Sequence, residues 1–376
     1  MPSWLLQSKR TMQLDFFPSR TLTVYLAKMF ITRILAVLVM LVLVLMMLDL
    51  LSASGGILAV EGNGQGELIT YASLRIPQLV ARFLPYSVLL ATLITLVGLN
   101  QNSEVVAMKA AGLSAHQVLS PLLLTAALVA VISFSFNERV VTRATETLKA
   151  WEATEFGALA PESGGKANIY LTDGQNVLSA ASISGSGEAI VMAGVTWYRR
   201  SPEGMIIEQV RAPRATYAAP GWELEQATRF EVSNAGSQNL DRLVVGQQVT
   251  PSQIDLATVD PDALPFWELT DSIRRYEEAG RRTDELRAKW WHKLSGPLSS
   301  VLMPLLGSIA AFGLARSGQL FVRAIIGMAL GFAYFVVDNA ALAMGNFGGY
   351  PPFLAAWAPF LLFLLVGETV LVRTEE

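Results

Sequence analysis

Long apolar segments separated by one large polar block are the feature that most constrains the fold of this chain. Of its 376 residues, 52% are hydrophobic and only 16% are charged, which is too apolar for an ordinary soluble domain. A helix needs about 20 mostly apolar residues to span the hydrocarbon core of a bilayer. Six stretches of that kind predict six transmembrane helices, at Ile34–Leu51, Ile76–Leu99, Val118–Phe136, Leu294–Leu314, Phe321–Ala343 and Phe353–Leu371.

The first apolar stretch admits two interpretations. Lys28 and Arg33 precede it and Ser52-Ala53-Ser54 follows it, as in a signal peptide with a small-residue cleavage site. Its apolar run and its leader, residues 1–33, are both long for a signal peptide, which favours a membrane anchor.

Basic residues in the flanks and short loops set the expected orientation, because cytoplasmic segments carry an excess of Lys and Arg. Five precede the first span and predict a cytoplasmic N-terminus: Lys9, Arg10, Arg20, Lys28 and Arg33. Six spans return the C-terminus to the cytoplasm. A basic cluster within residues 274–293 lies on the outer side in this scheme, where long translocated segments largely escape the charge rule.

The polar block, residues 137–293, is predicted to begin as β structure. Asp173-Gly174 separates two strand-like runs, which is the signal of a tight hairpin, and Pro220-Gly221 separates two more. Short strands with a turn about every 8 to 12 residues predict a sandwich or jelly roll. From Pro265 the pattern becomes helical, with a stop at Gly280 and a new helix start at Thr283.

These elements predict an α-helical membrane protein with six transmembrane helices and a β-jelly-roll domain inserted between helices 3 and 4. The expected divisions are a cytoplasmic N-terminus with an interfacial helix (1–33), three spans with a cytoplasmic loop helix at 101–112 (34–136), the β domain with its linkers (137–264), a helical connector (265–293) and three further spans (294–376).

The motifs of self-contained catalysis are missing from the sequence. Residues 164–167 lack the first Gly and the hydroxyl of a phosphate loop, and His116 and His292 lie too far apart to suggest a metal site. The chain has no cysteine. We therefore expect no catalytic residue, no metal and no cofactor, so the energy for any work would come from a partner.

The loop after the second span is the most plausible place to receive that energy. It opens with a helix-cap residue, Ser103, and closes with Gly112, which predicts a short helix. Three apolar residues beside Glu104 suit docking into a groove on a soluble partner, namely Val105, Val106 and Met108. A solvated interfacial helix is the alternative.

Several motifs, in order, resemble the LptF/LptG family of lipopolysaccharide-export permeases, and the resemblance runs from about residue 21 onward. They are this loop with Leu113-Ser114, Val24-Tyr25-Leu26-Ala27-Lys28, the run Lys289-Trp290-Trp291-His292-Lys293-Leu294-Ser295-Gly296-Pro297-Leu298, Phe335-Val336-Val337-Asp338, and Pro351-Pro352 with Ala356-Trp357-Ala358-Pro359. The last two are more similar to the LptG branch than to LptF. Each motif is loose, but their order and spacing together are specific.

The resemblance implies an inner-membrane ABC transporter permease that extracts lipopolysaccharide and passes it to a periplasmic bridge toward the outer membrane. The implied partners are lipopolysaccharide, a cytoplasmic LptB ATPase dimer, the second permease LptF and the bridge proteins LptC and LptA, with no nucleic acid. The segment 157–260 matches the periplasmic jelly roll, and Glu104 matches the acid that contacts the ATPase. The expected coupling residues are Ser103, Glu104, Val105, Met108 and Gly112.

Basic residues at the expected outer surface are candidates for contacts with lipid phosphates, because guanidinium and ammonium groups pair with phosphate. They are Arg75, Arg82, Arg139, Arg143, Lys149, Arg287, Lys289 and Lys293. Snorkelling to ordinary headgroups is the alternative for each. The outer end of the first span carries Asp49 and no basic residue, whereas LptG proteins can carry lysines there, so the resemblance does not extend to phosphate contacts at that position.

Three questions stay open from sequence. Asp338, near the outer end of the fifth span, is either functional or paired with a neighbour. Gly327 and Gly331 permit close helix contact, within one subunit or between two. The chain could also be the paralogue LptF, or a membrane-anchored scaffold whose β domain binds partners without transport.

Overall fold

The structure is a computed structural model that describes residues 18–373 except 154–155, 158–165, 186, 203, 234–235, 248, 252–253, 255–258, 279 and 313–319. The chain divides into two compact units. The first, here called the helical unit, comprises Met1–Leu41, Arg82–Ser135 and Trp291–Glu376. The second, the mixed unit, comprises Val42–Ala81 and Phe136–Trp290 and includes the β sheet.

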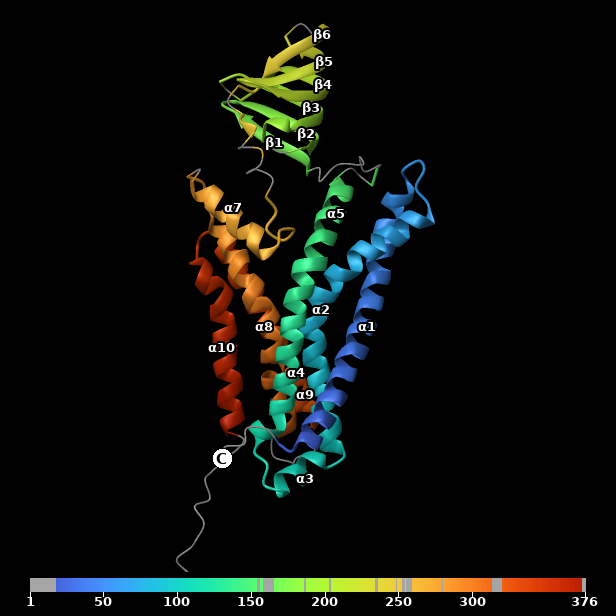
Figure 1. Ribbon diagram of the computed structural model, residues 1–376, viewed down its shortest axis with the longest axis vertical. Coiled ribbons are helices and arrows are strands. Elements are labelled where there is room, and N and C mark those ends of the chain that lie inside the picture. The colour runs from blue at the N-terminus through green and yellow to red at the C-terminus, as the bar shows by residue number, and fades with distance from the viewer. Residues whose placement is uncertain are drawn as a thin grey trace, which may run out of the picture. The chain divides into compact units, whose positions relative to one another are not determined.

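Helices account for most of the chain outside the sheet (Figure 1). They are α1 (Arg20–Leu58), α2 (Gln65–Gln101), α3 (Glu104–Ala110), α4 (Ala115–Phe136), α5 (Thr142–Ala153), α7 (Phe266–Glu278), α8 (Asp284–Phe312), α9 (Leu320–Asn346) and α10 (Pro352–Arg373). Within the described residues, five segments are long and apolar enough to cross a membrane: Arg20–Leu58, Gln65–Gln101, Ala115–Glu152, Ala324–Asn346 and Pro352–Arg373.

The predicted fourth span is the one that does not reach this standard. It lies in α8, whose apolar part is interrupted by Ser295, Ser299 and Ser300 and by two prolines. The last two residues of that predicted span, 313–314, lie outside the described residues. Five of the six predicted spans are therefore matched by a span-capable helix, and the predicted fourth span stays a prediction.

The beginning of the polar block is helical, which the sequence did not predict. A π-helical turn, Asn137–Val141, joins α4 to α5, so that the helical backbone continues from Ala115 through Ala153. A single extra residue in a helical turn is how such π segments arise, and they are accommodated without ending the helix.

Close contacts at glycine hold α9 against α2 inside the helical unit. A Cβ added at Gly331 would lie 2.2 Å from Leu89 Cδ2, and one added at Gly327 would lie 3.1 Å from Leu93 Cδ2. Small residues at this spacing let two helices approach closely. The glycine pair that was open from sequence therefore packs within the chain.

The sheet is antiparallel, with six strands in the order β1-β2-β3-β4-β5-β6. The strands are β1 (Lys166–Asp173), β2 (Asn176–Ser184), β3 (Val191–Arg200), β4 (Ile206–Ala218), β5 (Gly221–Glu231) and β6 (Gly236–Val245). The predicted Asp-Gly hairpin is present, with Asp173 opposite Asn176 and Gly174 at a φ of 61°.

The strand order differs from the predicted jelly roll. A jelly roll needs Greek-key connections between non-consecutive strands, whereas the described strands pair only with their neighbours in sequence. The reason is local: short turns such as 174–175 and 219–220 bring each strand back beside the one before it. The domain is a meander.

One face of the sheet carries its core. Trp222 is fully buried there, and its Nε1 donates a hydrogen bond of 2.8 Å to the carbonyl oxygen of Val249. Gly246, at a φ of 67°, turns the chain after β6 so that Val249 packs onto this face. Val249 and Ile254, which follow the last strand, therefore pack on the apolar side of the sheet.

The helical connector follows its sequence signals. α7 ends before Gly280, which has a φ of 65° and whose N–H donates to the carbonyl oxygen of Glu277 at 3.0 Å. α8 then begins at Asp284, one residue after the predicted cap Thr283, whose carbonyl accepts the first helical hydrogen bond from Arg287.

Candidate functional site

The short helix α3 is anchored to the core of the helical unit. Val105 and Met108 are 4% and 8% exposed and belong to the same buried cluster as residues of α1, α2 and α4. Tyr25 of α1 donates a hydrogen bond from Oη to Glu104 Oε2 at 3.2 Å. A helix of seven residues is too short to be stable alone, so these contacts define its position.

Both ends of α3 are set by residues in the left-handed region. Ser103 has a φ of 58° and its side chain makes no capping hydrogen bond, so it begins the helix differently from a conventional cap. Gly112 has a φ of 89° and donates its N–H to the carbonyl oxygen of Lys109 at 2.9 Å. Glycine adopts that conformation without the penalty of a Cβ.

Packing divides the five predicted coupling residues into two groups. One group contacts the rest of the chain (Glu104, Val105 and Met108), and the other is exposed (Ser103 and Gly112). Val105 and Met108 point into the core, and Glu104 is held by Tyr25, so these three side chains position α3. The surface that α3 presents to solvent consists of Ser103, Val106, Ala107, Lys109, Ala110, Ala111 and Gly112. Sequence reasoning missed the small residues of this surface, because their periodicity shows only once the buried face is known.

Four of the eight predicted phosphate-contact residues have acidic partners. Arg75 pairs with Asp49, Arg287 with Glu277, Lys289 with Asp262, and Lys149 with Asp260. Lys293 is 9% exposed. In this structure Arg75, Lys149, Arg287 and Lys289 therefore form ion pairs with carboxylates of the chain itself.

Three of the predicted basic residues are different, because they are exposed and no carboxylate in the described residues pairs with them. They are Arg82, Arg139 and Arg143. Arg139 and Arg143 are four residues apart on the continuous helix and therefore lie on one face of it. Arg82 belongs to the helical unit.

Asp49 forms a partly buried network that joins α1 to α2 within the mixed unit. Arg75 reaches it with two hydrogen bonds, from Nε to Oδ2 and from Nη2 to Oδ1, each 3.0 Å long. Tyr71 Oη also donates to Oδ2 at 2.8 Å, and Arg75 Nη1 donates to Gln78 at 2.8 Å. The charge of Asp49 is thus balanced by the charge of Arg75.

Asp338 is paired with a histidine. His292 Nε2 of α8 lies 3.0 Å from Asp338 Oδ2 of α9, and Asp338 is 7% exposed. The other carboxylate oxygen, Oδ1, is buried and has no hydrogen-bond partner in the described part of the chain. The neighbour that the sequence left open is therefore His292.

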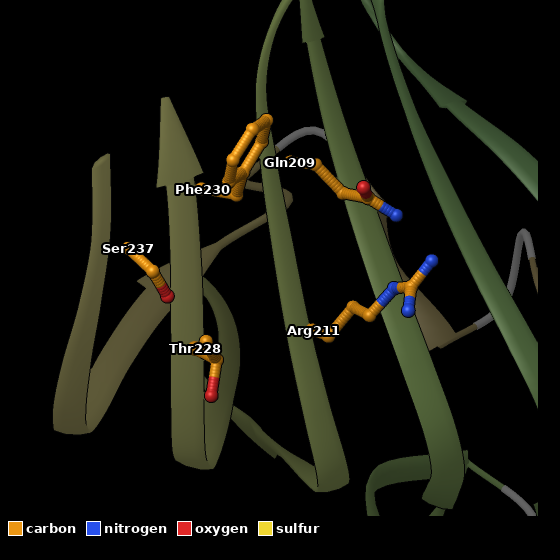
Figure 2. A pocket seen from close by; sticks show the side chains of 5 residues that line it. All are labelled: Gln209, Arg211, Thr228, Phe230 and Ser237. Atoms are coloured by element: carbon orange, nitrogen blue, oxygen red, sulfur yellow. The ribbon is translucent and has the colours of Figure 1, made fainter. Parts of the chain in front are cut away.

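A shallow pocket of about 380 Å³ lies on the sheet face opposite its core (Figure 2). Its lining alternates along β4 with the buried residues Glu208, Val210 and Ala212. The lining residues are Gln209, Arg211, Thr228, Phe230 and Ser237. They are exposed or partly exposed polar side chains with one aromatic ring, and they offer no nucleophile with an adjacent base.

The two edges of the sheet are open among the described strands, because β1 pairs only with β2 and β6 only with β5. Such edges expose backbone N–H and C=O groups that a strand from another chain can bind.

Among the described residues, no group of three or more His, Asp or Glu side chains could hold a metal ion.

Membrane-spanning helices and a β domain define the class of this protein: a multi-pass membrane protein with a large polar sheet domain. Residues 24–373 match the family model of the lipopolysaccharide export system permease LptF/LptG. The chain therefore belongs to the LptF/LptG family, whose members are transport subunits.

Two relatives show how far the similarity extends. The chain is 26% identical over 372 residues to the lipopolysaccharide export system permease protein LptG of Escherichia coli (strain K12), which covers 95% of this chain and 99% of that protein. It is 23% identical over 319 residues to LptG of Haemophilus influenzae, covering 82% of this chain and 87% of that protein.

Proposed function

We propose that this chain is the LptG-type permease subunit of an ABC transporter that extracts lipopolysaccharide from the inner membrane and passes it to a periplasmic bridge. Its partners would be an LptB ATPase dimer, the second permease LptF and the bridge proteins LptC and LptA. Both termini would lie in the cytoplasm, α8 would be the fourth of six spans, and the sheet would lie in the periplasm. The family match over residues 24–373 and the LptG relatives support this proposal.

The observation that carries the mechanism is the anchoring of α3 to the helical core. A partner that moves α3 also moves the residues that hold it, because Val105 and Met108 are buried among α1, α2 and α4. Packed interiors transmit displacement with little compression. ATP-driven motion of a docked ATPase would therefore reach the spanning helices directly.

The lipid would be held between this chain and the second permease and expelled toward the β domain when that cavity closes. Arg82, Arg139 and Arg143 are the candidates for phosphate contact with the best access. The paired basic residues would contribute after exchanging a carboxylate partner for a phosphate, which provides the same hydrogen-bond geometry.

Replacing Glu104 with Lys tests the proposal in the assembled complex. We expect insertion and complex formation to persist, ATP hydrolysis to continue, and lipopolysaccharide release to fall at least about tenfold, because one lost charged contact costs about 1.5–3 kcal/mol. The measurements are ATPase rate and lipid release from proteoliposomes. Unchanged release would argue against docking at α3.

A matched variant, Tyr25→Phe, separates two roles of Glu104. It removes the hydrogen bond that holds the Glu104 side chain but leaves the carboxylate in place. If Glu104 acts by contacting the ATPase, Tyr25→Phe retains most of the coupling. Co-purification in mild detergent completes the test. If the chain brings down no ATPase subunit, no second permease and no glycolipid, the proposed function is contradicted.

A further inference from the structure

Phe156 is a bulky residue held in an unusual backbone conformation. It follows α5 and has a φ of 62°, in the left-handed region that residues other than glycine rarely adopt. Its N–H donates a hydrogen bond of 3.0 Å to the carbonyl oxygen of Trp151 in α5. Such a conformation is costly and persists only where its surroundings hold it. The contacts of Phe156 should therefore explain why a phenylalanine occupies this position.

The Phe156 ring lies between α5 and the α1–α2 hairpin, the name used here for Val42–Ala81. It packs edge-on against Trp151 of α5 and Tyr71 of α2, with ring centroids 5.3 and 6.1 Å away. A Cβ added at Gly56 of α1 would lie 3.6 Å from Cε2 of the same ring. Edge-to-face aromatic pairs stabilise beyond the apolar area that they bury. One side chain therefore contacts three helices.

Asn63, in the turn between α1 and α2, adds a polar connection to the same place. Its Nδ2 donates one hydrogen bond of 2.9 Å to the carbonyl oxygen of Phe156 and another of 3.0 Å to that of Ile57. Ile57 lies in the last turn of α1, where carbonyl groups lack partners within the helix, and its side chain is fully buried. The amide of Asn63 thus holds the end of α1 and the backbone of Phe156 together.

Tyr71 extends the connection further back along α1. While its ring contacts Phe156, its hydroxyl donates a hydrogen bond of 2.8 Å to Asp49 Oδ2. Tyr71 is only 4% exposed, so both contacts are shielded from solvent. The C-terminal part of α1 is therefore joined to α5 at two levels, at Gly56 directly and at Asp49 through Tyr71.

α1 also connects this cluster to α3. The helix runs without a break over Arg20–Leu58. Near its first residue Tyr25 holds Glu104 of α3, and near its last residue Gly56 contacts Phe156. A series of direct contacts therefore leads from α3 along α1 to α5, and α5 in turn contacts β1.

Building on the proposed permease function, we propose that Phe156 is a positioning residue that passes movement of α1 to α5 and so to the beginning of the sheet domain. A partner that displaces α3 also displaces α1, because Tyr25 and buried residues of α1 hold α3. Phe156 makes the end of α1 and the end of α5 move together, since packed side chains transmit displacement with little compression. The sheet domain thereby moves in step with the ATPase.

The first test uses the full chain, assembled with its partner subunits in proteoliposomes, and measures lipopolysaccharide delivered to the bridge per ATP hydrolysed. In Phe156→Ala we expect this ratio to fall about tenfold, within the usual range of coupling between sites, while ATP hydrolysis continues. Phe156→Gly relieves the backbone strain but also lacks the ring, so it should lose the same coupling. Phe156→Tyr keeps the ring and should retain it.

A covalent bridge can replace the ring, because the chain has no native cysteine. In the double variant Gly56→Cys with Phe156→Cys, a reducible bis-methanethiosulfonate reagent should restore the ratio, and reduction should remove it again. Gly55→Cys with Phe156→Cys is the control and should gain nothing, because no heavy atom lies within 4 Å of a Cβ at Gly55. A bridged protein that stays uncoupled, or a full ratio in Phe156→Ala, would overturn the proposal.

A second measurement needs no transported lipid and so separates this inference from the proposed function. Spin labels are placed at the exposed positions Glu61 and Thr147, and their distance distribution is measured by pulsed EPR in the assembled complex. It should be narrow in the parent and broad in Phe156→Ala. Broadening in a complex that moves no lipopolysaccharide would support the mechanical connection and contradict the proposed function. Identical distributions would refute the connection even in an active transporter.

Discussion

At the residue scale, the contacts that define the candidate sites join positions far apart in sequence. Tyr25 and Glu104 are 79 residues apart, and His292 and Asp338 are 46 apart. Sequence patterns identified Glu104 and Asp338 as polar residues of interest, because a charge beside apolar segments is conspicuous. Their partners could not be predicted, since they depend on which helices pack together and at what rotation.

The pair formed by Asp49 and Arg75 yields a stability prediction. Asp49→Asn leaves Arg75 partly buried without its counter-charge, and we expect the free energy of unfolding to fall by about 1–3 kcal/mol. The estimate lies below that for a fully buried pair because the two side chains are 23% and 30% exposed. Thermal unfolding of the purified protein in detergent measures the effect.

The same substitution at an exposed pair is the control. Asp271 contacts Arg274 at 3.1 Å, but these side chains are 65% and 68% exposed, so Asp271→Asn should change the stability by less than about 0.5 kcal/mol. Removing both charges with Asp49→Asn and Arg75→Gln should recover part of the loss. Equal effects of Asp49→Asn and Asp271→Asn would refute a structural role for the network.

At the element scale, turns and caps were the parts of the fold most open to prediction. The Asp173-Gly174 hairpin and the break at Gly280 depend on local backbone conformation, which the sequence specifies directly. Strand β6 and the helix Thr142–Ala153 were missed. β6 is mostly exposed on both faces, so it lacks alternation, and α5 continues a span without a capping signal.

The close approach of α9 to α2 makes a second prediction. Gly331→Ala places a methyl group 2.2 Å from Leu89 Cδ2 and 3.1 Å from its Cγ, so the helices must separate or the leucine must move. We expect a loss of about 1–3 kcal/mol in stability, read from thermal unfolding, and partial rescue by Leu89→Ala in the same chain.

Gly55, also in a helix, has no heavy atom within 4 Å of where a Cβ would stand. Gly55→Ala should therefore leave stability unchanged or raise it by up to about 1 kcal/mol, as expected from helix propensity. If Gly331→Ala behaved like this control, the packing of α9 on α2 would be wrong.

At the scale of the whole molecule, membrane crossings decide which surfaces face which compartment. The helical class and the presence of a β domain followed from apolar length and turn spacing alone. The six predicted crossings are matched by five span-capable helices among the described residues, because α8 is diluted by serine, glycine and proline. A crossing by α8 would require neighbouring helices that shield those residues, and a hydropathy pattern does not contain that information.

A cysteine scan distinguishes six crossings from five, and the absence of native cysteine makes the labelling unambiguous. Phe347, in the loop between α9 and α10, is 83% exposed. If α8 crosses the membrane, Phe347→Cys reacts with an impermeant thiol reagent added from the periplasmic side. Tyr170→Cys on the sheet should react likewise, and Lys109→Cys should not. Protection of Phe347→Cys with labelling of Tyr170→Cys would show that α8 does not cross.

The meander also has a consequence for how such a domain can be carried within a helical chain. Successive strands reverse direction, so an even number of them returns the backbone to the end of the sheet from which it departed. Entry and exit of the six-stranded sheet therefore share one end, and the opposite end bears only hairpins. Loss or gain of a whole hairpin preserves this parity, whereas loss of one strand would send the outgoing chain to the far end.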